Sequence, residues 1–133
     1  MPIHKHDNQD LLNSFVVAPK IKIGTFTSPL GAGNFTINGL GFQPTMLQVL
    51  LLPLNSVIVT VNGLGIATLT DQFGTYMNVG QTSTNTAKII AYQNDLSVDQ
   101  VVATLSSFDA DGFTLNFTVA VLQRLFGYIA FSL

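Results

Sequence analysis

The sequence predicts an all-β protein: a β-sandwich of jelly-roll or Greek-key type, with about ten short strands and an extended N-terminal arm. From residue 21 onward, short runs rich in Val, Ile, Thr, Phe and Tyr alternate with clusters of Gly, Asn, Asp and Pro, which is typical of all-β proteins. In Phe113–Val119 apolar and polar residues alternate strictly, which indicates a strand with one buried and one hydrated face. Glu is absent and Lys is scarce, which disfavours helices because these residues stabilise exposed helix faces.

Ten runs are expected to form the strands. In chain order they are Ile21–Thr27, Asn34–Asn38, Met46–Leu52, Val57–Val61, Gly65–Thr70, Thr75–Val79, Thr86–Tyr92, Val101–Ser106, Phe113–Val119 and Leu125–Phe131. The run Met46–Leu52 is almost continuously apolar, and such a run favours a central strand that is covered on both faces. Ten short strands in one domain are best accommodated by two packed sheets.

Two segments carry turn signals. Asn62-Gly63 predicts a type I′ hairpin turn, because both central residues of that turn need positive φ. Asp109-Ala110-Asp111-Gly112 predicts a longer loop of the same kind between two strands. A short helical stretch around Ser97–Val101, with Ser97 as its N-cap, is an alternative to extended structure there.

The N-terminal residues differ from the rest of the chain. We divide the sequence into an arm, residues 1–20, and a β-sandwich domain, residues 21–133. The first ten residues are polar and are followed by an apolar stretch that could dock on a neighbouring subunit, with Leu11, Leu12, Phe15, Val16 and Val17 as the contact residues. The alternative is a polar tip followed by an ordinary first strand or helical turn.

Charged residues make up 9% of the sequence, against about 25% in a typical soluble domain. The net charge of −2 excludes the basic footprint of a nucleic-acid-binding protein. The chain has no Cys, so it forms no disulfide and has no thiolate nucleophile. The longest apolar run, Val49–Leu54, includes Pro53 and is too short for a transmembrane helix, and residues 1–7 are too polar for a signal peptide. We expect a soluble protein that binds neither nucleic acid nor membranes.

The sparse charge also bears on assembly. Charged side chains are the usual protection of exposed strand edges against unwanted pairing. A neutral β protein therefore either covers its edges with a partner or risks forming fibres, and we expect a homo-oligomer.

Catalytic and metal-binding patterns are weak. The two histidines, His4 and His6, lie in the arm, whereas a Ser-His-Asp triad needs a rigidly held base. The pairs Asp95/Asp99 and Asp109/Asp111 could serve a glycan hydrolase or, for the second pair, hold Ca²⁺, but Asp in such turn sequences normally binds its own backbone. Six imidazoles from three arms could bind a transition metal. We expect no enzyme activity, no cofactor and no metal.

Four segments, taken together, carry a resemblance that extends over most of residues 21–131. They are Ile21-Lys22-Ile23-Gly24-Thr25-Phe26-Thr27-Ser28, Gly39-Leu40-Gly41-Phe42-Gln43-Pro44, Ser107-Phe108-Asp109-Ala110-Asp111-Gly112-Phe113-Thr114-Leu115-Asn116 and Gly127-Tyr128-Ile129-Ala130. The chain resembles small β-rich virion proteins of tailed bacteriophages, which are head-decoration or tail-associated modules.

The resemblance implies a location in the virion, after assembly in the host cytoplasm. It also implies a homotrimer, an N-terminal arm that clamps neighbouring subunits, and the major capsid protein or another virion protein as partner. It brings no catalytic residues. We therefore expect a capsid decoration protein that stabilises the head shell by non-covalent contacts; the alternative is a tail or fibre module that binds host-surface glycans through loop Asn, Asp and Tyr residues.

Overall fold

The computed structural model describes residues 18–52, 63–75, 84–85, 87–93 and 98–133. These residues form strands joined by turns and loops, which confirms the predicted all-β, sandwich-like class. The strands are β1 (Lys20–Thr27), β2 (Gly33–Ile37), β3 (Met46–Leu51), β4 (Leu64–Thr68), β5 (Gln72–Thr75), β6 (Thr84–Asn85), β7 (Ile90–Gln93), β8 (Asp99–Asp109), β9 (Gly112–Ala120) and β10 (Leu125–Ser132).

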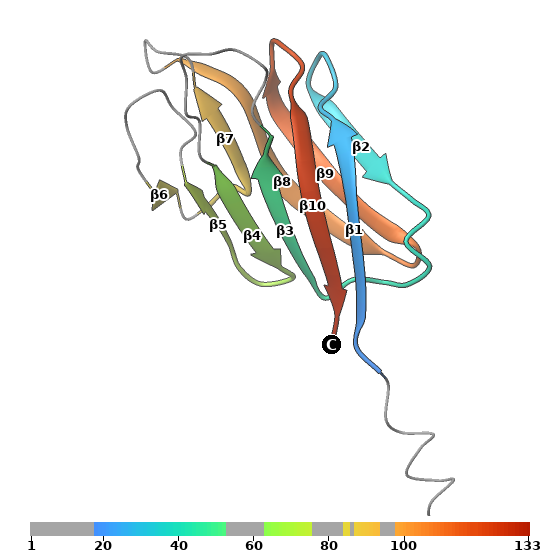
Figure 1. Ribbon diagram of the computed structural model, residues 1–133. Helices are drawn as coiled ribbons and strands as arrows, with labels where there is room; N and C mark the ends of the chain where they lie inside the picture. Colours follow the sequence, from blue (N-terminus) through green and yellow to red (C-terminus); the bar gives the residue numbers. More distant parts are fainter. Residues whose placement is uncertain (1–17, 53–62, 76–83, 86, 94–97) are drawn as a thin grey trace, which may run out of the picture.

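The strands are arranged in two antiparallel sheets. The six-stranded sheet has the order β1-β10-β3-β4-β5-β6, and the four-stranded sheet has the order β2-β9-β8-β7. In Figure 1 the six-stranded sheet lies in front of the longer strands β8 and β9. The C-terminal strand β10 is inserted between β1 and β3, so the two ends of the described chain pair with each other. The finer expectation of jelly-roll or Greek-key topology stays a prediction.

The core lies between the two sheets and is rich in aromatic rings. On the six-stranded sheet, Phe26 stacks on Phe126 with ring centroids 5.4 Å apart. Across the sandwich, Phe113 of β9 meets the ring of Tyr128 edge-on at 5.2 Å. On each sheet the core side chains come from alternate positions of the strands, because every second residue of a strand points to the same side. The fully buried side chains include Leu47, Val49, Ile89, Ile90, Val101, Phe113, Leu115, Phe117 and Phe126.

Most of the expected strands are present within one or two residues of their expected first residue, but two begin further away. The strand expected at Thr75–Val79 is β5, which already runs from Gln72 to Thr75. The reason is a tight turn: the Asp71 carbonyl accepts a 2.7 Å hydrogen bond from the Thr68 amide, so the chain reverses before position 72. The strand expected at Thr86–Tyr92 is β7, which begins at Ile90.

Three local expectations have different outcomes. Residues 99–101 are extended rather than helical, because they pair with β7 as part of β8. The Asp109–Gly112 segment is a tight hairpin rather than a longer loop, since Asp109 pairs directly with Gly112 and leaves two residues between the strands. Three expected features lie outside the described residues. They are the strand Val57–Val61, residue Asn62 of the type I′ turn, and residues 1–17 of the arm.

Candidate interaction surface

The most unusual surface of the molecule is the side of the six-stranded sheet that faces away from the core. We call it the outer apolar face. Its apolar residues come from β1, β3, β4, β5 and β10, with one residue just after β3. They are Ile21, Ile23, Met46, Leu50, Leu52, Leu64, Ile66, Phe73, Leu125, Ile129 and Phe131.

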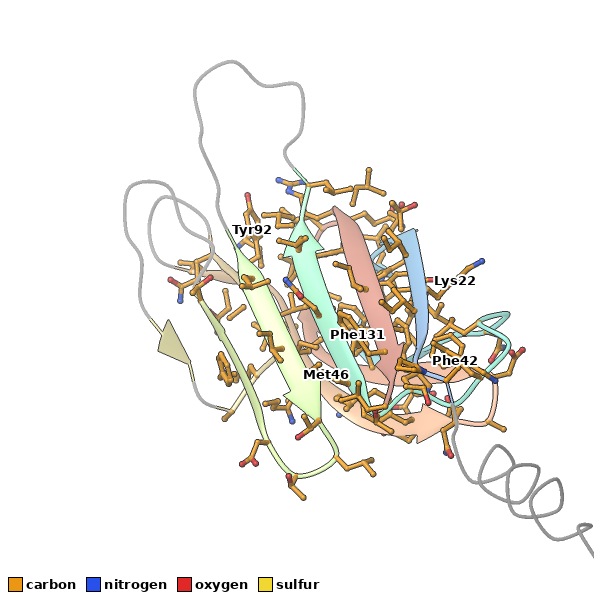
Figure 2. The ribbon with its side chains drawn as sticks, turned by 60° about the horizontal axis from the view of Figure 1, so that its bottom comes forward. Lys22, Phe42, Met46, Tyr92 and Phe131 are labelled. Atoms are coloured by element: carbon orange, nitrogen blue, oxygen red, sulfur yellow. The ribbon has the colours of Figure 1, made fainter. Side chains whose placement is uncertain are left out.

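The strand register aligns these side chains in rows across the sheet. The central row runs over five neighbouring strands: Ile23 pairs with Ile129, Ile129 with Gln48, Gln48 with Ile66, and Ile66 with Phe73. The row ends are strongly exposed, with 71% of Ile23 and 51% of Phe73 accessible to solvent. Figure 2 shows Met46 and Phe131, which form a second row together with Ile21, on the adjacent strands β3 and β10.

The outer apolar face carries no charged side chain among its described residues. Its remaining positions are Thr25, Thr27, Gln48, Thr68, Thr75 and Gly127. The lysines of β1, Lys20 and Lys22, alternate with Ile21 and Ile23 and therefore point to the opposite side of the sheet, at its edge. A continuous apolar area of this kind is typical of a surface that binds another molecule.

The expectation for Met46–Leu52 was half correct. The run does form a central strand, with β10 on one side and β4 on the other. Leu47 and Val49 are fully buried in the core, but Leu50 on the other side is 37% exposed. The expected cover of this second side is therefore incomplete in the described structure.

The outer face of the four-stranded sheet is polar and differs in chemistry. Its β9 residues alternate with the buried Phe113, Leu115 and Phe117 and are Thr or Asn. Asn34 pairs with Asn116 and Thr36 with Thr114, so amides and hydroxyls line neighbouring strands. This face has the hydrated pattern that the sequence predicted for Phe113–Val119. The two outer faces of one sandwich are thus opposite in polarity.

A hydroxyl network at the end of this polar face holds Asp109. The Thr114 and Ser107 hydroxyls each donate a 2.7 Å hydrogen bond to the Asp109 carboxylate, one to each oxygen. The hydroxyl of Thr36 lies 2.9 Å from that of Thr114 and extends the network to β2. The Thr114 hydrogen bond, followed by that of Ser107, lowers the pKa of Asp109 below its usual value, because both stabilise the carboxylate form.

The neighbouring Asp111 holds the loop that follows β2 through three hydrogen bonds. Its carboxylate accepts hydrogen bonds from the Gly39 amide at 3.0 Å and the Gly41 amide at 2.7 Å, and its carbonyl accepts one from the Leu40 amide. Gly39 and Gly41 have φ of 88° and 82°, a backbone conformation that L side chains rarely adopt. The loop can therefore turn its three amides toward one aspartate.

These contacts bear on the metal and catalytic candidates. Both oxygens of Asp109 and both of Asp111 already accept hydrogen bonds from the chain itself, although from the Ser107 and Thr114 hydroxyls and from the backbone N–H groups of a distant loop rather than from the backbone of their own turn. The carboxylate of Asp99 accepts a 2.9 Å hydrogen bond from the side-chain amide (Nε2) of Gln93. Within the described part of the chain, no three His, Cys, Asp or Glu side chains are grouped so that they could hold a metal ion.

The remaining candidates lie outside the described residues. They are His4 and His6, the arm residues Leu11, Leu12, Phe15, Val16 and Val17, and Asp95. Sequence reasoning did not identify the outer apolar face as a site. The signal was present in the apolar residues on both sides of Met46–Leu52, but it was interpreted as a core strand.

The comparisons with known proteins give no relative from which a site could be transferred. No protein family, no curated protein and no solved structure matches the chain. No helix that could cross a lipid bilayer is found among the residues that the structure describes.

Proposed function

We propose that the protein is a structural component of an assembly rather than a catalyst: a bacteriophage virion protein that forms homo-oligomers and stabilises the head shell by non-covalent contacts. The observation that carries the proposal is the outer apolar face. Strands lie about 4.8 Å apart and rise about 3.4 Å per residue, so the neighbouring strands β1, β10, β3, β4 and β5 together cover roughly 500 Å² at their own lengths. A patch of this size is at the upper end of what soluble monomers expose and marks interaction sites.

The low charge of the chain supports the same proposal. Burying a charged side chain at an interface costs free energy unless the charge is paired. A surface that stays covered in an assembly therefore favours neutral residues, as on the outer apolar face. The resemblance to phage virion proteins supplies the identity of the assembly, with the major capsid protein or another virion protein as partner, and the trimer that it implies stays a prediction.

In this proposal the arm makes the contact with the shell. The apolar segment of the arm, which precedes β1 in the sequence, consists of Leu11, Leu12, Phe15, Val16 and Val17. The segment from Leu11 to Val17 has no charge, whereas the first ten residues contain Lys5, Asp7 and Asp10. We expect the apolar part to dock on a shell subunit and the polar tip to stay hydrated.

Cosedimentation with shells tests the proposal. Phage head shells that lack the protein are incubated with the full-length protein and with a Leu12→Asp/Phe15→Asp variant. The matched control, Asn13→Asp/Ser14→Asp, adds the same charge to the same segment at polar positions. We expect the unsubstituted protein and the control to sediment with shells and the first variant to stay in solution. Failure of the unsubstituted protein to bind overturns the proposal. Equal binding by the unsubstituted protein, the variant and the control would show that the arm does not contact the shell.

A second candidate function, binding of host-surface glycans by a tail or fibre module, is favoured by the polar outer face of the four-stranded sheet. The amides of Asn34 and Asn116 and the hydroxyls of Thr36 and Thr114 are groups that hydrogen-bond sugars. Tyr128 does not provide an aromatic platform for a sugar ring, because it is buried in the core. A glycan array that is bound by the protein and not by an Asn116→Ala/Thr36→Ala variant would support this candidate, and a blank array would exclude it for the glycans displayed.

A further inference from the structure

The outer apolar face is expected to pack against another apolar surface. We infer that it packs against the same face of a second copy of this chain, related to the first by a two-fold axis. The inference rests on the proposed function, which requires that protein covers the face, and adds which protein does so.

The area of the face is at the lower limit for a pair of copies. With about 500 Å² from each copy, the contact would bury about 1,000 Å², the least expected of a biological interface, whereas stable complexes bury about 1,200 Å² or more, so the pairing should depend on concentration. Two sheets packed face to face lie about 10 Å apart, with strand directions within about 30° of each other. Rows of Ile, Leu and Phe on both sides can interdigitate at this spacing, as they do in the core of a sandwich.

The absence of charge is what self-pairing requires. A two-fold contact places each patch against an identical patch, so a charged residue near the axis would face its own copy. Like charges that face each other across an interface are strongly unfavourable. The outer apolar face avoids this cost, since none of its described residues is charged. An acidic or basic partner would gain nothing from such a surface.

Gln48 occupies the middle of the central row, between Ile129 and Ile66. Its amide has both donors and an acceptor, so the Gln48 side chains of two copies near a two-fold axis can bond to each other. Gln48 is the one polar member of this otherwise apolar row, and a polar residue within an apolar contact is a known means of fixing register. We therefore place the axis close to Gln48.

Pairing through the sheet edge is disfavoured by comparison. β1 is an edge strand, and Lys20 and Lys22 are exposed on it. Antiparallel pairing of β1 with β1 of a second copy would bring these lysines together, and edge lysines are a common protection against such pairing. Association through the face leaves the lysines in water.

Cross-linking through one introduced thiol tests the inference. The chain has no Cys, so Gln48→Cys carries a single thiol, at the proposed axis. A bismaleimide that spans about 10 Å matches the distance between packed sheets. We expect a covalent dimer from Gln48→Cys and none from Asn116→Cys, the matched control in the polar outer face of the four-stranded sheet. Adding Ile23→Lys, at a side chain that is 71% exposed, should abolish the cross-link without unfolding the protein.

Three results would overturn the inference: no cross-link from Gln48→Cys in the native oligomer, equal cross-linking of both single-thiol variants, or an odd number of chains in the native mass. The inferred two-fold contact gives an even number of chains and so replaces the homotrimer that the resemblance implies; a native mass of three chains would favour the trimer and overturn the inference. A trimer without the cross-link would leave the proposed function intact. Failure of the unsubstituted protein to bind shells would overturn the proposed function whatever the cross-linking gives.

Discussion

The backbone of Gly65 on β4 lies against the backbone of Ile89, the residue before β7, so that a Cβ at position 65 would overlap the Ile89 carbonyl oxygen. Ile89 is itself held by a 3.1 Å hydrogen bond from its amide to the Ala103 carbonyl. The six-stranded and four-stranded sheets therefore come into main-chain contact at this point. Backbone cannot move aside as a flexible side chain can, so the contact requires a residue without a side chain.

Replacing Gly65 by Ala should destabilise the fold. Overpacking of this kind typically costs about 1–3 kcal/mol, and here the clash is with backbone. Urea unfolding followed by circular dichroism should show a lower midpoint for Gly65→Ala. The matched control is Gly127→Ala on β10, where the new Cβ would meet Leu52 at an ordinary 3.6 Å. Equal midpoints for the two variants would contradict the close approach of the sheets.

Asp111→Ala should loosen the loop after β2. The substitution removes the carboxylate that accepts hydrogen bonds from the Gly39 and Gly41 amides, and we expect a loss of about 1 kcal/mol in the free energy of unfolding. Amide hydrogen exchange is the direct measurement, with faster exchange at Gly39 and Gly41. Ala110→Ser, in the same hairpin turn, serves as the control. Unchanged protection of both glycine amides in Asp111→Ala would refute the assignment.

The pKa of Asp109 should depend on Thr114. Thr114→Val removes the hydrogen bond that contributes most to the lowered pKa, so the pKa should rise toward its usual value of 3.8. Because the folded pKa is depressed, the contribution to stability is present above pH 3.8 and is lost as the pH falls through the folded value. An NMR titration of the Asp109 carboxyl carbon measures the change. Thr118→Val, at an exposed position of the same strand, should leave the titration unaltered.

Tyr128 should make the protein sensitive to alkali. Burial raises the pKa of Tyr128 above its usual value of 10.0, because the phenolate form is poorly solvated in the core. Below pH 10.0 the phenol is protonated in both the folded and the unfolded chain, so its ionisation does not change the free energy of unfolding. Above pH 10.0 the unfolded chain releases the proton more readily than the folded chain, and the free energy of unfolding therefore falls. Thermal unfolding between pH 8 and about pH 11 should show a smaller loss for Tyr128→Phe than for the unsubstituted protein. Parallel curves would argue against this origin of alkaline instability.

The sequence predicted the strands best where the alternation was strict. In Phe113–Val119 each odd residue up to Phe117 is buried in the core as expected, and β9 extends the prediction by one residue at each end. β5 was placed too late, because the reversal depends on the hydrogen bonds between Thr68 and Asp71 and lacks a strong Gly or Pro signal. Local patterns therefore locate strands, while individual side-chain contacts set their limits.

The candidate surface could not be predicted, for a different reason. The central row joins Ile23 to Ile129, residues that are adjacent in space because β10 is inserted next to β1. Such non-local register follows from the packing of the whole sheet and is not encoded by any short pattern. An apolar run also shows that a side chain prefers to be covered but not what covers it. Met46–Leu52 was for this reason assigned entirely to the core.

The central claim, that a second copy covers the outer apolar face, is tested most directly by the mass of the protein in solution. Sedimentation velocity over a range of concentrations compares the unsubstituted protein with Gln48→Lys, which places a charge at the centre of the face, and with Thr118→Lys on the opposite sheet as control. We predict an even multiple of 14.3 kDa for the unsubstituted protein and the control, and the monomer mass for Gln48→Lys. An unsubstituted protein that stays monomeric at every concentration, or an oligomer that Gln48→Lys leaves unchanged, would contradict the claim.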